Sequence, residues 1–197
     1  MNRTIFSMRS YVDGLFNLYS KLLVLRVDLS YKRDRASVID IADLKKDVNR
    51  FLGNRRSKTS IFNSMVGYIL KYEYGSDKGP HCHAIFFLDG NLVRHDEYIA
   101  DLIGQYWSDV IARGDGLYYN CNRSKHQYSH LGIGMIAYWD DAKRHSLLEH
   151  VIGYLDKTEQ SIEMMDDEKG WRSFTRGVLP VRESAAGRPR LYQSNGA

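Results

Sequence analysis

The apolar residues of the chain recur with two periods, and each period indicates a different kind of secondary structure. An apolar residue every three or four positions predicts helices over residues 4–20, 41–52, 99–111 and 141–160. Apolar positions that are continuous or alternate predict strands over residues 22–31, 66–74, 81–88, 117–119 and 131–136, with residues 171–178 as a final candidate. The segment 22–31 begins as a continuous apolar run, which is typical of a central strand buried on both faces.

The order of these segments predicts a mixed fold. The strands 66–74 and 81–88 are joined by a short connection that contains Gly75, Gly79 and Pro80, which indicates an antiparallel hairpin. A hairpin excludes an all-parallel sheet, so we expect an α+β fold with a central antiparallel sheet of about five strands, flanked by helices. Residues 1–182 are expected to form a single domain, and residues 183–197 a flexible basic tail.

Composition narrows the classes of protein to consider. The 197 residues are enough for one domain with a sizeable core, and the formal net charge of +4 is mildly basic. No apolar run reaches the roughly 18 residues of a membrane-spanning helix, and the first residues lack the apolar block of a signal peptide. The two cysteines are too few for a disulfide framework. We therefore expect a cytoplasmic protein without disulfides.

The hairpin carries the strongest chemical signal. His81 and His83 are two positions apart in a strand, so their side chains point to the same face of the sheet. Glu73 lies near the turn in the partner strand, where a register that brings it beside His83 needs no distortion. Two imidazoles and one carboxylate leave coordination positions open, which suits metal-assisted catalysis better than structural zinc. The alternative is that the two histidines line the solvent face of the sheet.

The expected helix 141–160 carries a candidate nucleophile beside its core stripe. Tyr154 and Lys157 lie on adjacent turns, so the ammonium group of Lys157 would favour the phenolate form of Tyr154. Tyrosine has an unperturbed pKa of about 10 and needs such help, or a metal-polarised target, to act as a nucleophile. Tyrosines commonly border helix cores and this chain has 14, so the pattern is weak when taken alone.

Together these motifs resemble the HUH endonuclease superfamily. His81-Cys82-His83 is similar to its His-hydrophobic-His motif, and Tyr154-Leu155-Asp156-Lys157 is similar to the Tyr-x-x-Lys motif of its rolling-circle replication initiators. The strand 22–31 occupies the place of the superfamily's first strand motif, and the resemblance spans residues 20–180. The chain looks most like the initiators of filamentous phages (inoviruses) and their integrated relatives, which implies an RRM-like antiparallel sheet.

The resemblance also implies an activity and the residues that perform it. His81, His83 and Glu73 would bind Mg²⁺ or Mn²⁺, and Tyr154, assisted by Lys157, would attack a phosphodiester of single-stranded DNA. The products would be a 5′-phosphotyrosine and a free 3′-OH for a polymerase to extend, so that nicking starts rolling-circle replication of a phage or related mobile element. The implied partners are single-stranded DNA or an origin hairpin and the host helicase and polymerase, in a bacterial cytoplasm and away from membranes.

Two groups of side chains are expected to contact the DNA. Positive charge gathers between residues 45 and 58, and the basic loop with Arg55, Arg56 and Lys58 is expected to follow the phosphate backbone. Tyr72 and Tyr74 are expected to stack on unpaired bases.

Two positions depart from the motifs. Cys82 replaces the usual bulky aliphatic residue, which is a mild change because a free cysteine behaves as a small hydrophobe. Gly153 occupies the position next to Tyr154, so the motif has one tyrosine rather than two. The resemblance therefore does not support a reaction cycle in which two tyrosines alternate within one active site.

Other interpretations remain open. The spacing of Cys121, His126 and His130 is similar to that of zinc ligands and suggests a zinc-stabilised binding module, although a fourth ligand is not evident nearby. A second alternative is a catalytically silent DNA-binding module that acts as a regulator. A relaxase or a single-tyrosine transposase would share the proposed chemistry.

Overall fold

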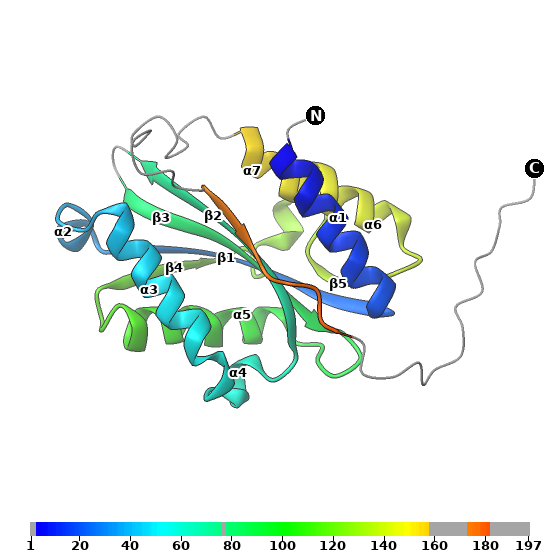
Figure 1. Ribbon diagram of the computed structural model, residues 1–197, viewed down its shortest axis with the longest axis horizontal. Helices are drawn as coiled ribbons and strands as arrows, with labels where there is room; N and C mark the ends of the chain where they lie inside the picture. The colour runs from blue at the N-terminus through cyan, green and yellow to red at the C-terminus, as the bar shows by residue number, and fades with distance from the viewer. Residues whose placement is uncertain (1–2, 76–77, 158–172, 182–197) are drawn as a thin grey trace, which may run out of the picture.

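A computed structural model describes residues 3–75, 78–157 and 173–181 of the chain. The strands form one six-stranded sheet (Figure 1). Its centre consists of three long strands, which lie side by side in the order β1 (Lys21–Tyr31), β3 (Gly79–Asp89) and β2 (Met65–Gly75). Each of the shorter strands pairs with one of these: β4 (Gly116–Asn120) and β5 (Gly134–Ala137) with β1, and β6 (Phe174–Arg176) with β2. Every pairing among the described strands is antiparallel, so the predicted α+β fold is confirmed.

Helices cover both faces of the sheet (Figure 1). One face is covered by α1 (Arg3–Leu18) and by the consecutive segments α6 (Asp141–Ser146), η4 (Leu147–Ile152, a π-helix) and α7 (Gly153–Lys157). The other is covered by α3 (Ile41–Gly53) and by α5 (Asp96–Gln105) with its π-helical continuation η2 (Tyr106–Ile111). We call these the α1 face and the α3 face. The short helical segments are α2 (Arg33–Ala36), η1 (Asn54–Arg56), α4 (Thr59–Phe62) and η3 (Lys125–Gln127).

Alternation along the strands assigns each side chain to one face. On the α3 face, β1 and β3 are apolar along most of their length, and these side chains form a continuous core with α3 and α5. On the α1 face, the same strands are apolar only toward one end, where Leu22, Val24 and Phe87 belong to a second core with α1. Toward the hairpin, the α1 face carries polar or charged side chains instead: Arg26, Asp28, Lys71, Glu73, His81 and His83.

The helix α3 is fixed by a capped end and an apolar stripe. The Asp40 carboxylate accepts a hydrogen bond from the backbone N–H of Asp43 at 2.8 Å, and the Asp43 carboxylate accepts one from the N–H of Asp40 at 3.4 Å. This reciprocal cap satisfies N–H groups that have no partner within the helix. Leu44, Val48 and Phe51 recur at helical spacing and are buried. The α3 face of the hairpin is thereby held by a rigid, well-packed helix.

The structure departs from the predicted segments at several places. Gly79 and Pro80, predicted as a turn, already belong to β3. The basic loop predicted around Arg55, Arg56 and Lys58 contains the end of η1 and leads into α4. The strand predicted at 131–136 begins only at Gly134; Gly132 lies before it and packs against the backbone of Leu147, where a Cβ atom would lie 2.5 Å from the Leu147 nitrogen. The helix predicted over 141–160 contains the π-helix η4. Residues 158–160, 171–172 and the predicted tail 183–197 lie outside the described residues.

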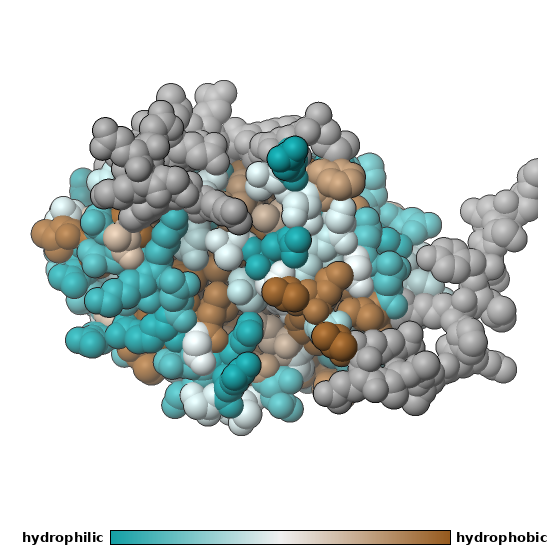
Figure 2. Space-filling view, viewed as in Figure 1, coloured by the Kyte–Doolittle hydropathy of each residue, from teal (hydrophilic) through white to brown (hydrophobic). Residues whose placement is uncertain are grey.

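The described surface is polar over α3 and carries an apolar patch near the end of β6. Figure 2 shows hydrophilic side chains over the outer side of α3 and an apolar patch where the chain leaves β6. Val178 and Val181 are the strongly exposed side chains of this last segment. In the part of the chain that the structure describes, every helix is too short or too polar to cross a membrane.

Candidate active site

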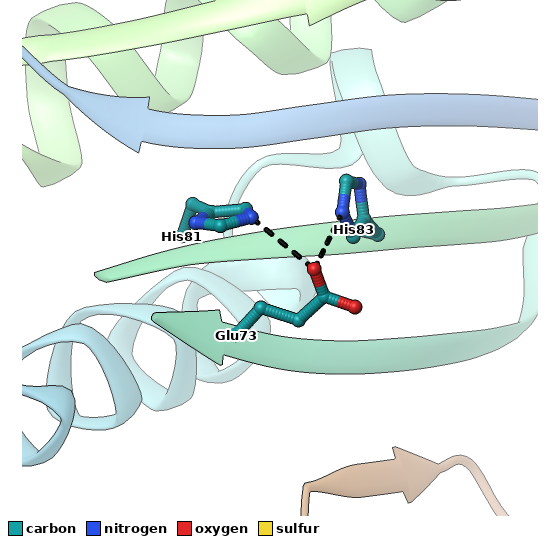
Figure 3. A group of neighbouring side chains, drawn as sticks. All are labelled: Glu73, His81 and His83. Atoms are coloured by element: carbon teal, nitrogen blue, oxygen red, sulfur yellow. Dashed lines mark ion pairs between the residues drawn. The ribbon is translucent and has the colours of Figure 1, made fainter. Parts of the chain in front are cut away.

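Glu73, His81 and His83 converge on the α1 face near the turn of the hairpin (Figure 3). The Glu73 Oε2 atom lies 3.4 Å from Nε2 of His81 and 3.3 Å from Nε2 of His83. One donor atom from each residue lies within 4.8 Å of the others, so the three side chains can hold a metal ion. The register places Glu73 opposite His81 rather than beside His83, but its side chain reaches both rings.

Both imidazoles are oriented by acceptors behind them. The His83 Nδ1 atom lies 2.8 Å from the Asp28 carboxylate of the neighbouring strand β1, and the His81 Nδ1 atom lies 3.0 Å from the carbonyl oxygen of Gly79. In the neutral imidazole that binds a metal, each Nδ1–H would donate to its acceptor and each Nε2 atom would offer its lone pair to the ion. A carboxylate or carbonyl behind each histidine is the usual support of a metal-binding imidazole. The contacts around the three residues thus fit a bound cation.

Gly79 is required at the start of β3 for steric reasons. Its φ angle is 64°, which is a left-handed conformation that favours glycine. A Cβ atom at this position would also lie 2.9 Å from the carbonyl oxygen of Ala36. Because the Gly79 carbonyl accepts the hydrogen bond of His81, this glycine positions one of the candidate metal ligands.

The electrostatics of the cluster favour positive charge. Burial alone would lower the pKa of His83, but its hydrogen bonds to Asp28 and Glu73 outweigh burial and raise that pKa to about 9. Burial alone would raise the pKa of the Asp28 carboxyl, but the hydrogen bond from His83 and the charge of Arg26 hold it below its usual range. Two carboxylates around nearly buried imidazoles create the negative potential that a divalent cation would neutralise.

Arg26 connects this cluster to Tyr154. The guanidinium group donates from Nε to the Asp28 carboxylate at 3.2 Å, and its central carbon lies 5.9 Å from the centre of the Tyr154 ring. The backbone N–H of Arg26 donates to the Asn122 side chain at 2.9 Å, which fixes this part of β1. Tyr154 itself is half exposed, and its contact with Arg26 places its ring beside the face of the sheet that carries the cluster.

Comparison with known proteins adds a family. A family model described as the YagK/YfjJ C-terminal domain matches residues 1–176, which is most of the chain. The chain belongs to this family. The matched range includes the candidate metal ligands and Tyr154 of this YagK/YfjJ C-terminal domain. No curated protein and no solved structure matches the chain.

Two lysines of this YagK/YfjJ C-terminal domain bear on the chemistry of the site. Lys157, predicted to assist Tyr154, is the last residue of α7, and its side chain lies outside the described structure. Lys71 is buried on the α1 face opposite His83, and its ammonium nitrogen lies 4.4 Å from the centre of the Phe174 ring. Lys71 is therefore a second cation, besides Arg26, close to the candidate metal ligands.

The side chains predicted to bind DNA lie apart from the cluster. Tyr72 is buried in the core of the α3 face, so its ring cannot stack on a base. Tyr74 is partly exposed and follows the same alternation to the α3 face. Arg55, Arg56 and Lys58 are exposed, and Arg55 lies over Tyr68 at 5.8 Å. Tyr68 precedes Glu73 by five residues of β2, or about 17 Å.

The zinc interpretation of Cys121, His126 and His130 finds no support in the geometry. Among the described residues, the group that converges on a shared point is Glu73, His81 and His83. Cys121 is buried, and burial raises the pKa of its thiol to about 11, whereas zinc binds the thiolate. His130 instead stacks on His150, with ring centres 3.7 Å apart.

Two residues of the site were not identified from the sequence. Arg26 and Asp28 interrupt the apolar run of their strand at alternate positions, and this interruption was the available signal. Their importance depends on pairing, because β1 lies beside β3 with Asp28 directly opposite His83. The strand order β1–β3–β2, which places a carboxylate on each side of the histidine strand, is not encoded in local spacing.

Proposed function

We propose that the protein nicks and rejoins single-stranded DNA, with Tyr154 as the nucleophile and Mg²⁺ or Mn²⁺ held by Glu73, His81 and His83. In the cell, this reaction starts rolling-circle replication of a phage or related mobile element, as the resemblance to HUH initiators implies. The observation that supports the proposal most strongly is a chain of contacts: the Tyr154 ring lies against Arg26, Arg26 binds Asp28, and Asp28 holds His83. Candidate nucleophile and candidate metal ligands thus belong to one network.

The reaction is a transesterification in which one phosphodiester replaces another. The bound metal would polarise the scissile phosphate and neutralise the charge that develops on it. The phenolate oxygen of Tyr154 forms a bond to phosphorus while the bond to the 3′ oxygen breaks, and that oxygen takes up a proton to leave as a 3′-OH. The phosphotyrosine keeps the bond energy for rejoining. Arg26 holds the tyrosine ring through a cation–π contact.

The partners of this reaction follow from its chemistry. The substrate is single-stranded DNA or an unpaired segment of an origin hairpin, because the phosphodiester must reach the α1 face without a complementary strand. The free 3′-OH is a primer, so a polymerase and a helicase of the host would act on the product. Arg55, Arg56 and Lys58 are exposed and supply backbone affinity away from the reacting phosphate.

A covalent-adduct assay tests the proposal. The purified protein is incubated with labelled single-stranded DNA from its own genetic element and Mn²⁺, and a labelled band that resists denaturation is sought. We expect an adduct that forms only when the metal is present. The adduct should disappear in Tyr154→Phe, because this variant keeps the ring and removes only the attacking oxygen. Tyr138→Phe is a matched control that should keep the adduct, because Tyr138 does not line the cavity beside Tyr154. Persistence of the adduct in Tyr154→Phe would assign the nucleophile to another residue. Binding of DNA without any adduct would instead indicate a silent DNA-binding module.

A further inference from the structure

A cavity of about 230 Å³ lies beside the candidate active site. Arg26 contributes to both, because it lines this cavity and contacts Tyr154 and Asp28. Two other lining residues, His150 and Val151, lie about one turn before Tyr154 in the same helical run. The remaining wall comes from the segment between β4 and β5 and consists of Gln127, Tyr128, Ser129, His130, Gly132 and Ile133.

A pair of stacked imidazoles forms part of this wall. The rings of His130 and His150 lie 3.7 Å apart at their centres with an angle of 9° between their planes. His145 meets His150 edge-on, with ring centres 6.3 Å apart. The His130 and His150 side chains are both exposed, so the stacked rings offer a flat aromatic surface at the surface of the protein. Flat aromatic side chains are the usual platforms for unpaired bases.

The cavity also contains groups that can read the edge of a base. Gln127 offers both a donor and an acceptor, and Ser129 and Tyr128 each offer a hydroxyl group. The volume is smaller than the roughly 300–1,000 Å³ of pockets for drug-sized ligands, so it suits one base rather than a larger ligand. A phosphate is the less suitable occupant, because the Arg26 guanidinium already donates to the Asp28 carboxylate from Nε and Nη2.

We propose that this cavity, the base pocket, holds one unpaired nucleobase of the DNA strand that Tyr154 attacks, adjacent to the scissile phosphate. The base lies against the stacked pair of His130 and His150, and its edge faces Gln127. Anchoring that base fixes the neighbouring phosphate between Tyr154 and the metal ligands. The position of the base within the strand rests on the proposed nicking activity, but its binding does not require cleavage.

Binding measured without cleavage tests the base pocket. Protein carrying Tyr154→Phe, in the presence of EDTA, is titrated with a short oligothymidylate and with an abasic oligonucleotide of the same length and backbone charge. Because the electrostatic contribution of the backbone is equal, the ratio of the two affinities measures the interactions with bases. We expect the oligothymidylate to bind about tenfold more tightly or better.

Variants of one loop locate the interaction. His130→Ala should reduce the affinity ratio several-fold, whereas His130→Phe, which retains a flat ring, should largely restore it. His126→Ala is the matched control: His126 is exposed in the same loop but does not line the cavity, so the ratio should be unchanged. A circular dichroism spectrum and a thermal melt of each variant verify folding.

The possible results separate this inference from the nicking activity. A ratio near one for the parent protein, or a ratio that His130→Ala leaves unchanged, would overturn the base pocket even if the covalent adduct forms. An adduct that never forms, together with a ratio that depends on His130, would overturn the nicking activity and leave the base pocket standing. A ratio that falls equally in His126→Ala and His130→Ala would place the bound base elsewhere in the loop and reject the assignment to the cavity.

Discussion

The two faces of the sheet at the hairpin end differ sharply, although they are built from alternating residues of the same strands. On the α3 face, Leu29, Tyr72 and Cys82 are buried in an apolar core under helices. On the α1 face, Asp28, Glu73 and the two histidines are held by hydrogen bonds and ion pairs. Neighbouring residues of one strand therefore have different roles: one side anchors the strand and the other presents donor groups.

Cys82 on the α3 face and Glu73 on the α1 face are both buried, but burial has a different physical consequence for each. Cys82 is fully buried between two candidate ligands, and burial raises the pKa of its thiol, so it remains an apolar contact rather than a metal donor. Glu73 is 4% exposed, and a buried carboxylate is costly unless it is paired. The charged side chains of the α1 face are tolerated because the carboxylates and imidazoles pair with one another. In our proposal, a bound cation adds a further partner for these donor atoms.

Removal of either histidine should cause the largest effect. His81→Ala or His83→Ala deletes a candidate ligand and should abolish metal-dependent adduct formation, because two remaining donors hold a divalent ion poorly. Metal binding is measured by calorimetry with Mn²⁺, and the adduct by gel electrophoresis. Cys82→Ala, between the two histidines but on the α3 face, is the control and should still bind the metal. Equal metal affinity in His83→Ala and the parent protein would refute the assignment.

The α3 face should respond in stability rather than in metal binding. Leu29→Ala removes a fully buried side chain and should lower the free energy of unfolding by about 2–5 kcal/mol. Denaturation with urea measures this decrease, and calorimetry at a temperature where the variant is folded measures its metal affinity. We expect little change in affinity per folded molecule. A loss of affinity as large as that of His83→Ala would mean that the two faces are not independent.

Asp28→Asn should produce an intermediate effect on the α1 face. The carboxylate orients His83 through a contact of 2.8 Å and also binds Arg26, so the amide weakens both interactions without changing the shape of the side chain. Loss of such a support behind a metal ligand costs about 10–100-fold in metal affinity. Mn²⁺ titration measures it, with Asp34→Asn, on an exposed helix outside the site, as a control. An unchanged affinity would show that Asp28 does not position the metal ligand.

The sequence predicted the α3 face and most of the fold well, because periodicity reflects burial directly. The helices near 4–20 and 41–52 and the strands near 22–31, 66–74 and 81–88 all exist, with ends shifted by a few residues. The observed strand ends differ from the predicted ones at two places. The strand β5 begins only at Gly134, which has a positive φ angle, and β3 includes Pro80, which was predicted as a turn residue. The additional short helices, such as α2, have too few residues for a periodic signal.

The sequence predicted those candidate site residues that lie within one hairpin and missed those on other strands. Glu73, His81 and His83 lie in two strands joined by a short turn, so alternation and pairing place them together. The contributions of Asp28 and Arg26 require knowledge that β1 pairs with β3, which is a long-range property. Tyr72 was predicted to stack on bases from its residue type alone, and its position in the alternation, opposite to Glu73, places it in the core instead.

The smallest expected effects concern the basic residues far from the cluster. Arg55 and Arg56 are exposed near the start of β2, at the end opposite to Glu73, so they should contact the DNA backbone rather than the reacting phosphate. Arg55→Glu combined with Arg56→Glu should weaken binding of all single-stranded sequences by a similar factor. It should also reduce the slope of log affinity against log salt concentration by about 0.7 for each phosphate that the variant no longer neutralises.

Fluorescence anisotropy over a range of salt concentrations measures both quantities, with a cognate and a scrambled oligonucleotide in parallel. Lys32→Glu combined with Arg33→Glu changes the net charge by the same amount at two exposed positions outside the basic loop, and serves as the control. If the cognate oligonucleotide alone loses affinity, the two arginines read bases rather than backbone. That result would move sequence recognition to the far end of β2 and would separate it in space from the proposed nicking site, whereas a uniform decrease would leave recognition close to Tyr154.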